Sequence, residues 1–231
     1  MNNPNAGALL RSTELFASLD EDTADQLAQQ MITRSYSKGQ QLVHQGDAGA
    51  TLFVIVDGCV SVFVTSENGD RMTLATLGRT DVFGEIALLD EGPRSASAEA
   101  VERTTVLTLS RSAFVALLRD QPAVLDQLLR VMGALARRLS EQTADFVFLD
   151  LPGRVAKVVL RLAQDSGLAA NGNPVEVAVT QARLAEMVGG SRQSVNQILQ
   201  NFQQRGMLEV AGRRLVVTDA ELLRRRAGIA S

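Results

Sequence analysis

The sequence is poor in the residues that build metal clusters and disulfides. Its 231 residues include one cysteine, Cys59, and one histidine, His44. A lone cysteine cannot form a disulfide within the chain or hold an iron–sulfur cluster, and the two residues together are too few for a His/Cys metal site. A haem would need axial ligands, and His44, close to the turn signal Gly46, is better interpreted as a surface residue. The low cysteine content fits a reducing cytoplasm.

Long apolar runs and catalytic constellations are scarce as well. No window approaches about 18 consecutive apolar residues, so we expect no membrane span. Residues 1–10 lack a basic region followed by an apolar stretch, so we expect no signal peptide. Neither Ser95 nor Ser191 has a suitable histidine partner, and Glu85 and Asp90 lack a metal or an acid–base partner. The sequence therefore predicts a cytoplasmic protein that is not an enzyme.

Charge is divided unevenly along the chain. The net charge is −3, but residues 151–231 hold 11 Lys and Arg against 6 Asp and Glu, which is +5 and leaves −8 for residues 1–150. A basic final third indicates a polyanion partner such as nucleic acid, although plain surface variation would give the same split. The apolar content of 45% is enough for a core in each of two domains.

Antiparallel β structure is predicted between residues 34 and 109. Residues 1–12 read as a loose tail and residues 13–32 as short helices. From Arg34, short apolar or alternating runs follow one another, each closed by a turn signal, with Asp57-Gly58 and Asn68-Gly69 as the strongest hairpin signals. Strands at a spacing of about 8–12 residues predict a small barrel or jelly roll.

The stretch from Phe83 to Ser97 is the one insert in this region that does not read as a strand. It begins with Gly84-Glu85 and ends with Arg94 beside Ser95. The apolar residues between them suit one helical turn, whose backbone N–H groups can hold a phosphate together with the arginine. The glutamate can accept hydrogen bonds from sugar hydroxyls. The stretch therefore predicts a pocket for a sugar phosphate.

A long helix is predicted over residues 123–149, which contain no proline and one glycine. Ser110 caps a shorter helix before it, and Pro122 starts the new one. Its seam residues repeat at alternating steps of three and four, as in a heptad pattern: Leu125, Leu128, Met132, Leu135, Leu139, Gln142, Phe146 and Leu149. A helix packed on its own domain is the alternative, but so strict a stripe favours a dimer coiled coil.

Residues 150–231 predict a winged helix-turn-helix domain. Asp150-Leu151-Pro152-Gly153 interrupts the long helix, and a further helix and a short strand follow. Thr180 caps a helix over 181–188, Gly189-Gly190 makes a tight turn, and Ser191 caps a second helix to about Gln204. That second helix has a polar face of side-chain types that read base edges: Arg192, Gln193, Asn196 and Gln200.

The segment after this helix reads as a hairpin over residues 208–217 whose basic tip, Arg213-Arg214, is placed to contact phosphate. A solvated helix face followed by an ordinary hairpin is the alternative interpretation of the whole region. The run Arg224-Arg225-Arg226 is either a phosphate contact or a polar chain end.

Together these motifs resemble the cyclic-AMP receptor protein and fumarate–nitrate regulator family of bacterial transcription factors, over roughly residues 13–220, with most likeness to actinobacterial cyclic-AMP-responsive members. Residues 83–96 are similar to its phosphate-binding cassette, residues 148–156 to its hinge, and residues 190–196 to the start of its recognition helix. The resemblance implies an α+β fold with four parts: a flexible tail over 1–12, an antiparallel barrel or jelly-roll sensor domain for a cyclic nucleotide over 13–122, a dimerisation helix over 123–149, and a winged helix-turn-helix domain over 150–231.

The resemblance also implies roles in ligand binding. Glu85 would hold the ribose 2′-hydroxyl, and Arg94 and Ser95 would bind the cyclic phosphate. Backbone groups would come from Gly84, Ile86 and Ala87. Leu139 and Ser140 stand where cyclic-AMP receptors use a threonine followed by serine or asparagine to contact adenine across the dimer; Ser140 fits this pattern, whereas Leu139 cannot form a hydrogen bond.

On the DNA side, the resemblance implies that the contact residues are Thr180, Ser191, Arg192, Gln193, Ser194, Asn196, Gln197 and Arg213. Gln193 and Gln197 replace a glutamate and an arginine of cyclic-AMP receptors, so the half-site sequence need not be the usual one. A palindromic site with half-sites about one helical turn apart is still expected, because dimer symmetry sets it.

These implications predict a cytoplasmic homodimer that binds a palindromic operator in double-stranded DNA, acts with RNA polymerase, and is controlled by a cyclic nucleotide, with cyclic AMP as the first choice and no other cofactor. The alternative is a regulator of the same family that binds DNA without a cyclic nucleotide or responds to another ligand such as cyclic di-GMP. The cassette also resembles cyclic-nucleotide domains of kinases and channels, but no kinase motif or membrane span accompanies it.

Overall fold

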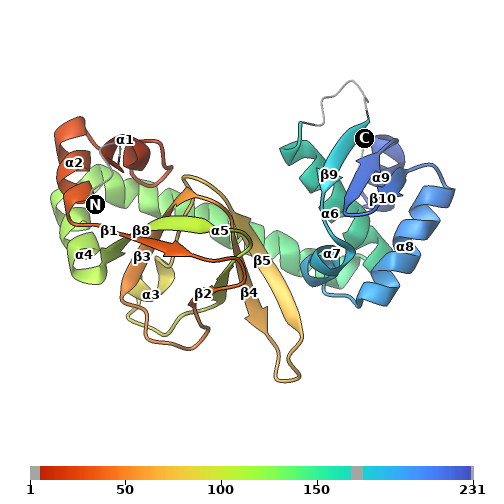
Figure 1. Ribbon diagram of the computed structural model, residues 1–231, viewed down its shortest axis with the longest axis horizontal. Helices are drawn as coiled ribbons and strands as arrows, with labels where there is room; N and C mark the ends of the chain where they lie inside the picture. Colours follow the sequence, from red (N-terminus) through yellow and green to blue (C-terminus); the bar gives the residue numbers. More distant parts are fainter. Residues whose placement is uncertain (1–5, 168–173, 230–231) are drawn as a thin grey trace. The chain divides into compact units, whose positions relative to one another are not determined.

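The computed structural model describes residues 6–167 and 174–229 (Figure 1). The chain divides into two compact units with the boundary between Arg137 and Arg138, and each unit is described by itself. No helix among the described residues is long and apolar enough to cross a membrane.

The first unit begins with two short helices, α1 (Ala6–Arg11) and α2 (Glu21–Gln29). Leu9 and Leu10 of α1 are buried in a core that also contains Phe16 and Leu27. The prediction of a flexible tail is therefore wrong for residues 6–11, while residues 1–5 lie outside the described part of the chain. The physical reason is tertiary: a six-residue helix has little stability of its own, and burial of its two leucines holds it in place.

Eight strands form two four-stranded antiparallel sheets, which confirms the predicted antiparallel barrel or jelly roll. One sheet has the order β1-β8-β3-β6 and the other the order β2-β7-β4-β5. The strands are β1 (Ile32–Tyr36), β2 (Gln41–Val43), β3 (Thr51–Asp57), β4 (Val60–Thr65), β5 (Arg71–Leu77), β6 (Val82–Phe83), β7 (Ser97–Ala100) and β8 (Thr104–Ser110).

Strand β3 explains why its sequence is apolar without interruption. Leu52 and Val54 face the core shared with the helices, whereas Phe53 and Ile55 face the core between the sheets. Because neighbouring side chains of a strand point to opposite faces, a strand covered on both faces needs apolar residues at every position. The predicted insert follows β6 as the one-turn helix α3 (Ile86–Leu89).

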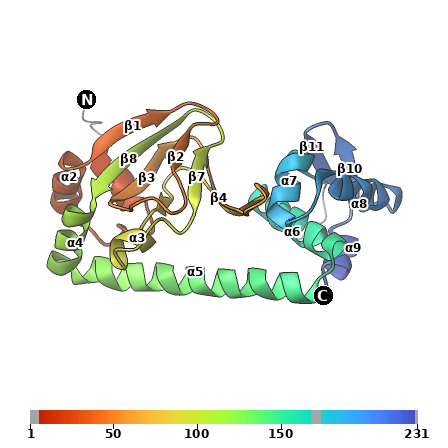
Figure 2. The same cartoon turned by 90° about the horizontal axis from the view of Figure 1, so that it is seen from below.

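Two helices complete the unit, α4 (Arg111–Asp120) and the first part of α5 (Pro122–Phe148). Ser110 accepts a hydrogen bond from the Ala113 N–H and so caps α4 as predicted. Leu88 of α3 lies in one core cluster with Val124 and Leu128 of α5, so the insert packs beside the long helix (Figure 2).

The predicted apolar seam of α5 serves two purposes. Leu128 is buried in the core of its own unit and Met132 packs against that core, as the alternative interpretation required. Leu125, Leu139 and Phe146 remain between 38% and 40% exposed. Only part of the heptad stripe is therefore left for a partner helix.

The second unit is built around α6 (Leu151–Asp165) and a three-stranded antiparallel sheet of order β10-β11-β9. The remaining elements are β9 (Val175–Ala178), α7 (Gln181–Val188), α8 (Arg192–Gln204), β10 (Leu208–Ala211), β11 (Arg214–Val217) and α9 (Ala220–Arg226). Val195, Leu199 and Phe202 of α8 are buried in the unit's core, as their helical spacing predicts. The predicted winged helix-turn-helix is confirmed.

Candidate functional site

The cassette begins with a glycine that no other residue could replace without strain. Gly84 has a φ of +88°, and a Cβ placed there would lie 2.6 Å from Nη1 of Arg94 and 3.0 Å from the Thr51 carbonyl oxygen. Glycine thus lets the backbone approach the arginine side chain closely. The structure brings together two members of the predicted phosphate-binding set, Gly84 and Arg94.

Arg94 is 6% exposed and is held by backbone carbonyls. Its Nη1 donates to the Gly84 oxygen at 2.9 Å and its Nη2 to the Thr51 oxygen at 2.7 Å. The Nε atom is buried without a hydrogen-bond partner among the described residues. Burial lowers the pKa of Arg94 from its ordinary value, against the opposing charges of Glu85 and Asp47. Arg94 is therefore a fixed cation with one donor left unused, which suits an anion.

The other predicted cassette residues surround the start of α3. Glu85 precedes the helix and no side chain caps it. Ile86 and Ala87 form its first turn, where Ala87 is buried and Ser95 is exposed near the end of the insert. Ser95 follows Arg94 directly in the sequence, and the contact of its hydroxyl and of the first α3 N–H groups with a phosphate stays a prediction.

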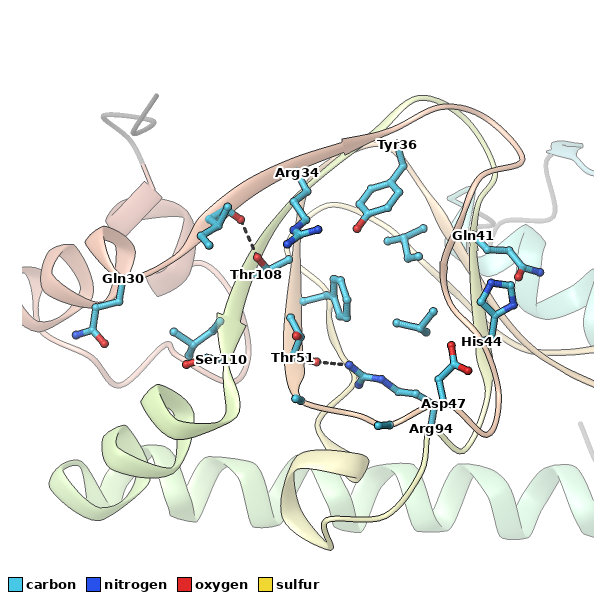
Figure 3. Close-up of a pocket in the computed structure, with 17 residues that line it drawn as sticks. Gln30, Arg34, Tyr36, Gln41, His44, Asp47, Thr51, Arg94, Thr108 and Ser110 are labelled. Carbon is cyan, nitrogen blue, oxygen red and sulfur yellow. Dashed lines mark hydrogen bonds between the residues drawn. The ribbon is translucent and has the colours of Figure 1, made fainter.

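A pocket of about 500 Å³ lies beside Arg94 within the first unit. Arg34 and Tyr36 reach into it from β1, and Asp47 and Arg94 lie on its opposite side (Figure 3). Among the described residues that line it, Arg94 is the one member of the predicted ligand set. Sequence reasoning missed the others, although the alternation along residues 32–36 could have indicated that Arg34 and Tyr36 share one face.

Leu139 and Ser140 lie on α5 beyond the boundary between the units. The Leu139 side chain is 40% exposed, and its carbonyl accepts a hydrogen bond from the Thr143 hydroxyl at 2.9 Å. Their contact with a nucleotide stays a prediction.

Several predicted DNA-contact residues hold the helix-turn-helix itself together. The Thr180 hydroxyl accepts a hydrogen bond from the Arg183 N–H and caps α7, and the Ser191 hydroxyl accepts one from the Ser194 N–H and caps α8. Between these helices Gly189 is left-handed, with a φ of +61°. The capping residues stabilise the motif and place its first amides at the protein surface.

The reading face of α8 is largely open. Arg192, Gln193 and Gln197 have exposed side chains. Asn196 is half-buried, and its side-chain oxygen accepts a hydrogen bond from the Gln181 amide of α7 at 3.1 Å. Arg213, at the tip of the β10–β11 hairpin, is also exposed.

The basic run of α9 has partners within its own unit. Arg224 and Arg225 lie within 3.4 Å of Glu221. Arg226 pairs with Asp150 at 2.6 Å. These pairs favour a structural role for the run over a phosphate contact.

Two families of known domains match this chain. Residues 33–121 match the cyclic nucleotide-binding domain, and residues 153–226 match the Crp-like helix-turn-helix domain. The CRP-like cAMP-activated global transcriptional regulator of Mycobacterium tuberculosis is 33% identical over 220 residues, which are 95% of this chain and 98% of the relative. The chain belongs to the cyclic-AMP receptor protein and fumarate–nitrate regulator family. It is a Crp-like DNA-binding transcription regulator with a cyclic nucleotide-binding domain, and the family consists of regulators rather than enzymes.

Further members of the family support the assignment. The cyclic AMP receptor protein of Thermus thermophilus is 35% identical over 217 residues, which are 93% of this chain and 96% of the relative. The solved structure of the Thermus thermophilus catabolite activator protein is 33% identical, covers 94% of this chain and all of that one, and has a TM-score of 0.55. The regulator CLP of Xanthomonas campestris, described as responsive to cyclic di-GMP, has a TM-score of 0.77 over 86% of this chain and 99% of that one; at 20% identity it shows the fold alone.

In this Crp-like regulator, the segment predicted to be the hinge is held by polar contacts within the second unit. Asp150 caps α6 by accepting from the Gly153 N–H at 2.9 Å, and both of its carboxylate oxygens accept from Arg226. Arg154 donates to the carbonyls of Leu149 and Val188 and lies 4.7 Å over the Phe146 ring. These contacts join the end of α5, the start of α6 and the end of α7.

The Asp150 contacts predict a pH-dependent contribution to stability. Hydrogen bonds from Arg226 and from the Gly153 N–H lower the pKa of Asp150 below its ordinary value of 3.8. The contribution of these contacts to the free energy of unfolding is therefore complete above pH 3.8. It disappears as the pH falls through the lowered pKa of the folded state. Asp150→Asn keeps the cap but loses the ion pair. Because the pair is exposed, we expect the free energy of unfolding to fall by about 0.2–1 kcal/mol at pH 7.

Urea unfolding of both proteins, repeated from pH 7 to about pH 3, measures this effect. The difference between wild type and Asp150→Asn is expected to stay constant above the ordinary pKa of 3.8 and to decrease as the pH falls below it. A difference that stays constant over the whole range would show that the carboxylate charge of Asp150 does not stabilise the start of α6.

Proposed function

We propose that this regulator binds a cyclic nucleotide, first of all cyclic AMP, in the Gly84–Ser95 cassette, and that occupancy raises the affinity of its α8 helices for a palindromic operator. The observation that carries the proposal is Arg94. Its guanidinium is fixed by two backbone carbonyls, its Nε lacks a partner among the described residues, and it is buried beside the glycine that opens the cassette. A buried cation with an unused donor is stabilised by a phosphate.

The other cassette residues suit the sugar and the phosphate. Glu85 lies close enough to Arg94 for its charge to favour the protonated arginine. A carboxylate held in this position can accept hydrogen bonds from a ribose hydroxyl. Ser95 and the backbone N–H groups of Ile86 and Ala87 supply the remaining donors for the phosphate. The names of the Mycobacterium and Thermus relatives, which refer to cyclic AMP, favour adenine as the base.

Dimerisation is the second part of the proposal. Leu125, Leu129 and Leu139 leave 40%, 62% and 40% of their surface exposed along α5, which is an apolar surface that a second copy of the helix would cover. A palindromic operator has two half-sites in successive major grooves, about 34–36 Å apart, and a two-fold symmetric dimer would supply one α8 helix to each. RNA polymerase is the partner through which a promoter-bound dimer would act.

Base contacts on the DNA are assigned to α8. Arg192 suits contact with guanine. Gln193 and Gln197 suit contact with adenine, because their amides offer both a donor and an acceptor. Thr180, Ser191, Ser194 and Arg213 suit phosphate contacts, since they lie at helix starts and at the tip of the hairpin. Ligand binding would shift the dimer between two states that differ in the placement of these helices.

Calorimetric titration with cyclic AMP, cyclic GMP and cyclic di-GMP tests the ligand. Binding of cyclic AMP with the highest affinity is the expected result. Binding of cyclic di-GMP alone would favour the alternative ligand, for which Leu139 is the supporting observation. Absence of binding heat with all three, together with unchanged melting temperatures, would contradict the cyclic-nucleotide proposal.

Leu139 gives a direct test of base recognition. Leu139→Thr supplies the hydroxyl that cyclic-AMP receptors use at this position, and one added hydrogen bond of about 0.5–1.5 kcal/mol corresponds to roughly two- to tenfold tighter binding of cyclic AMP. Leu139→Val is the matched control, because valine has the same shape as threonine and no hydroxyl. Equal affinities of the threonine and valine variants, measured calorimetrically, would show that residue 139 does not contact the base.

A further inference from the structure

The pocket beside Arg94 contains polar side chains that the proposed nucleotide site does not use. Its charged and hydroxyl groups come from β1, from the segment after β2 and from the end of β8, and they include Arg34, Tyr36, His44, Asp47 and Ser110. Gly84, Glu85, Ile86, Ala87 and Ser95 are not among the described residues that line it. The pocket is therefore a second concave surface that shares one arginine with the cassette.

The charge of this pocket is not balanced. Asp47 lies close enough to Arg94 for its negative charge to favour the protonated arginine, so the charges of these two residues balance one another. Arg34 is exposed, and no described residue lies within ion-pair distance of it. The buried Nε of Arg94 also lacks an acceptor in the described part of the chain. An anion in the pocket would meet the uncompensated guanidinium of Arg34 and lie beside the buried guanidinium of Arg94.

The pocket also has an apolar wall. Ile32 of β1 is 60% exposed although it is a large aliphatic side chain, and it lines the same pocket as Leu42, Val43 and Phe53. Tyr36 adds an aromatic ring that faces the same space (Figure 3). A volume of about 500 Å³ is within the range of small-molecule sites. Apolar walls with a few converging polar groups are typical of such sites.

We propose that this pocket is a second ligand site, which takes a small organic anion, a carboxylate or phosphate ester with a short apolar chain. The anionic group would lie between Arg34 and Arg94, and the chain would cover Ile32, Leu42 and Phe53. Tyr36, which lies beside Arg34 in Figure 3, carries a hydroxyl that can donate a hydrogen bond to the anionic group.

The shared arginine would couple the second site to the nucleotide site, a coupling that rests on the proposed function. Arg94 holds Gly84 of the cassette and also lines the pocket. An anion bound next to Arg94 would change the affinity of the cassette for a nucleotide. A bound nucleotide would change the affinity of the pocket for the anion by the same factor. The concentrations of the anion and of the nucleotide would then both control this regulator.

The composition of the chain provides a local probe. Tyr36 is the single tyrosine and there is no tryptophan, so tyrosine fluorescence reports on this pocket. We would titrate nucleotide-free protein with hexanoate and, separately, with butyl phosphate, up to about 10 mM, at which a ligand with a Kd of about 1 mM is mostly bound. The uncharged 1-hexanol is the control ligand. A saturable change with either anion and none with the alcohol is expected; the two anions distinguish a carboxylate from a phosphate ligand.

Matched variants locate the binding site. Arg34→Gln is expected to lower the affinity for the anion at least tenfold. Arg103→Gln, which removes an exposed arginine outside the pocket, is expected to leave this affinity unchanged. Both variants should bind cyclic AMP as the wild type does. The proposal is overturned by an absent fluorescence change, by an equal response to 1-hexanol, by an unaffected Arg34→Gln variant, or by loss of nucleotide binding in that variant. Anion binding without any nucleotide binding would leave the second site standing and reject the proposed function instead.

Discussion

Arg94→Leu is expected to abolish the response of DNA binding to cyclic nucleotide. The substitution removes the fixed cation that would face the phosphate, and it removes the two hydrogen bonds to the carbonyls of Gly84 and Thr51. A hydrogen bond between charged groups contributes about 1.5–3 kcal/mol, so loss of the one donor that Arg94 has free for the phosphate weakens nucleotide binding at least tenfold. Calorimetry and operator binding with and without nucleotide measure the effect.

The Arg94→Leu dimer should remain intact, because the exposed apolar surface of α5 is unchanged, and light scattering can check this. Arg94→Lys is a useful second variant: it keeps the charge but cannot reach both carbonyls with a planar fork, so intermediate affinity is expected. Ligand-dependent operator binding of normal strength in Arg94→Leu would refute the assignment of the cassette.

Arg192→Ala is expected to remove specific DNA binding and to leave nucleotide binding unchanged. Arg192 is exposed at the first turn of α8. A bidentate arginine–guanine contact contributes about 1–3 kcal/mol to discrimination against the wrong base. A symmetric dimer loses two such contacts, which gives a loss of about 2–6 kcal/mol, or roughly thirtyfold to more than a thousandfold in affinity.

Fluorescence anisotropy measures this loss with an operator selected from a random DNA pool, at one fixed salt concentration, because affinity for DNA depends steeply on salt. Arg225→Ala is the matched control: it removes the same charge from α9, where Arg225 contacts Glu221 and is 70% exposed. Operator affinity that is unchanged in Arg192→Ala would show that α8 does not read the bases through this residue.

Local patterns in the sequence were sufficient to predict most of the fold. The alternating and continuous apolar runs became β3, β4, β5 and β8, and Ser110, Thr180 and Ser191 cap the helices that they were expected to cap. These features depend on residues within a few positions of one another. The order of the three motifs also identified the family before the fold was known.

The features that the sequence did not predict depend on distant contacts. Helix α1 is too short to be recognised from its own residues and is held by the core. The carbonyl that fixes Arg94 belongs to Thr51, 43 residues earlier, and no local signal joins them. The heptad pattern of α5 gives the same signal for a core position such as Leu128 and for an exposed position such as Leu139. Periodicity identifies an apolar face but not the surface that covers it.

The affinity of the selected operator as a function of nucleotide concentration tests most directly whether cassette occupancy controls α8. We expect operator binding to tighten at least tenfold between nucleotide-free protein and saturating cyclic AMP. The midpoint should match the calorimetric affinity, and the effect should be absent in Arg94→Leu. Identical operator affinity without nucleotide and at saturating cyclic AMP, cyclic GMP and cyclic di-GMP would contradict the account.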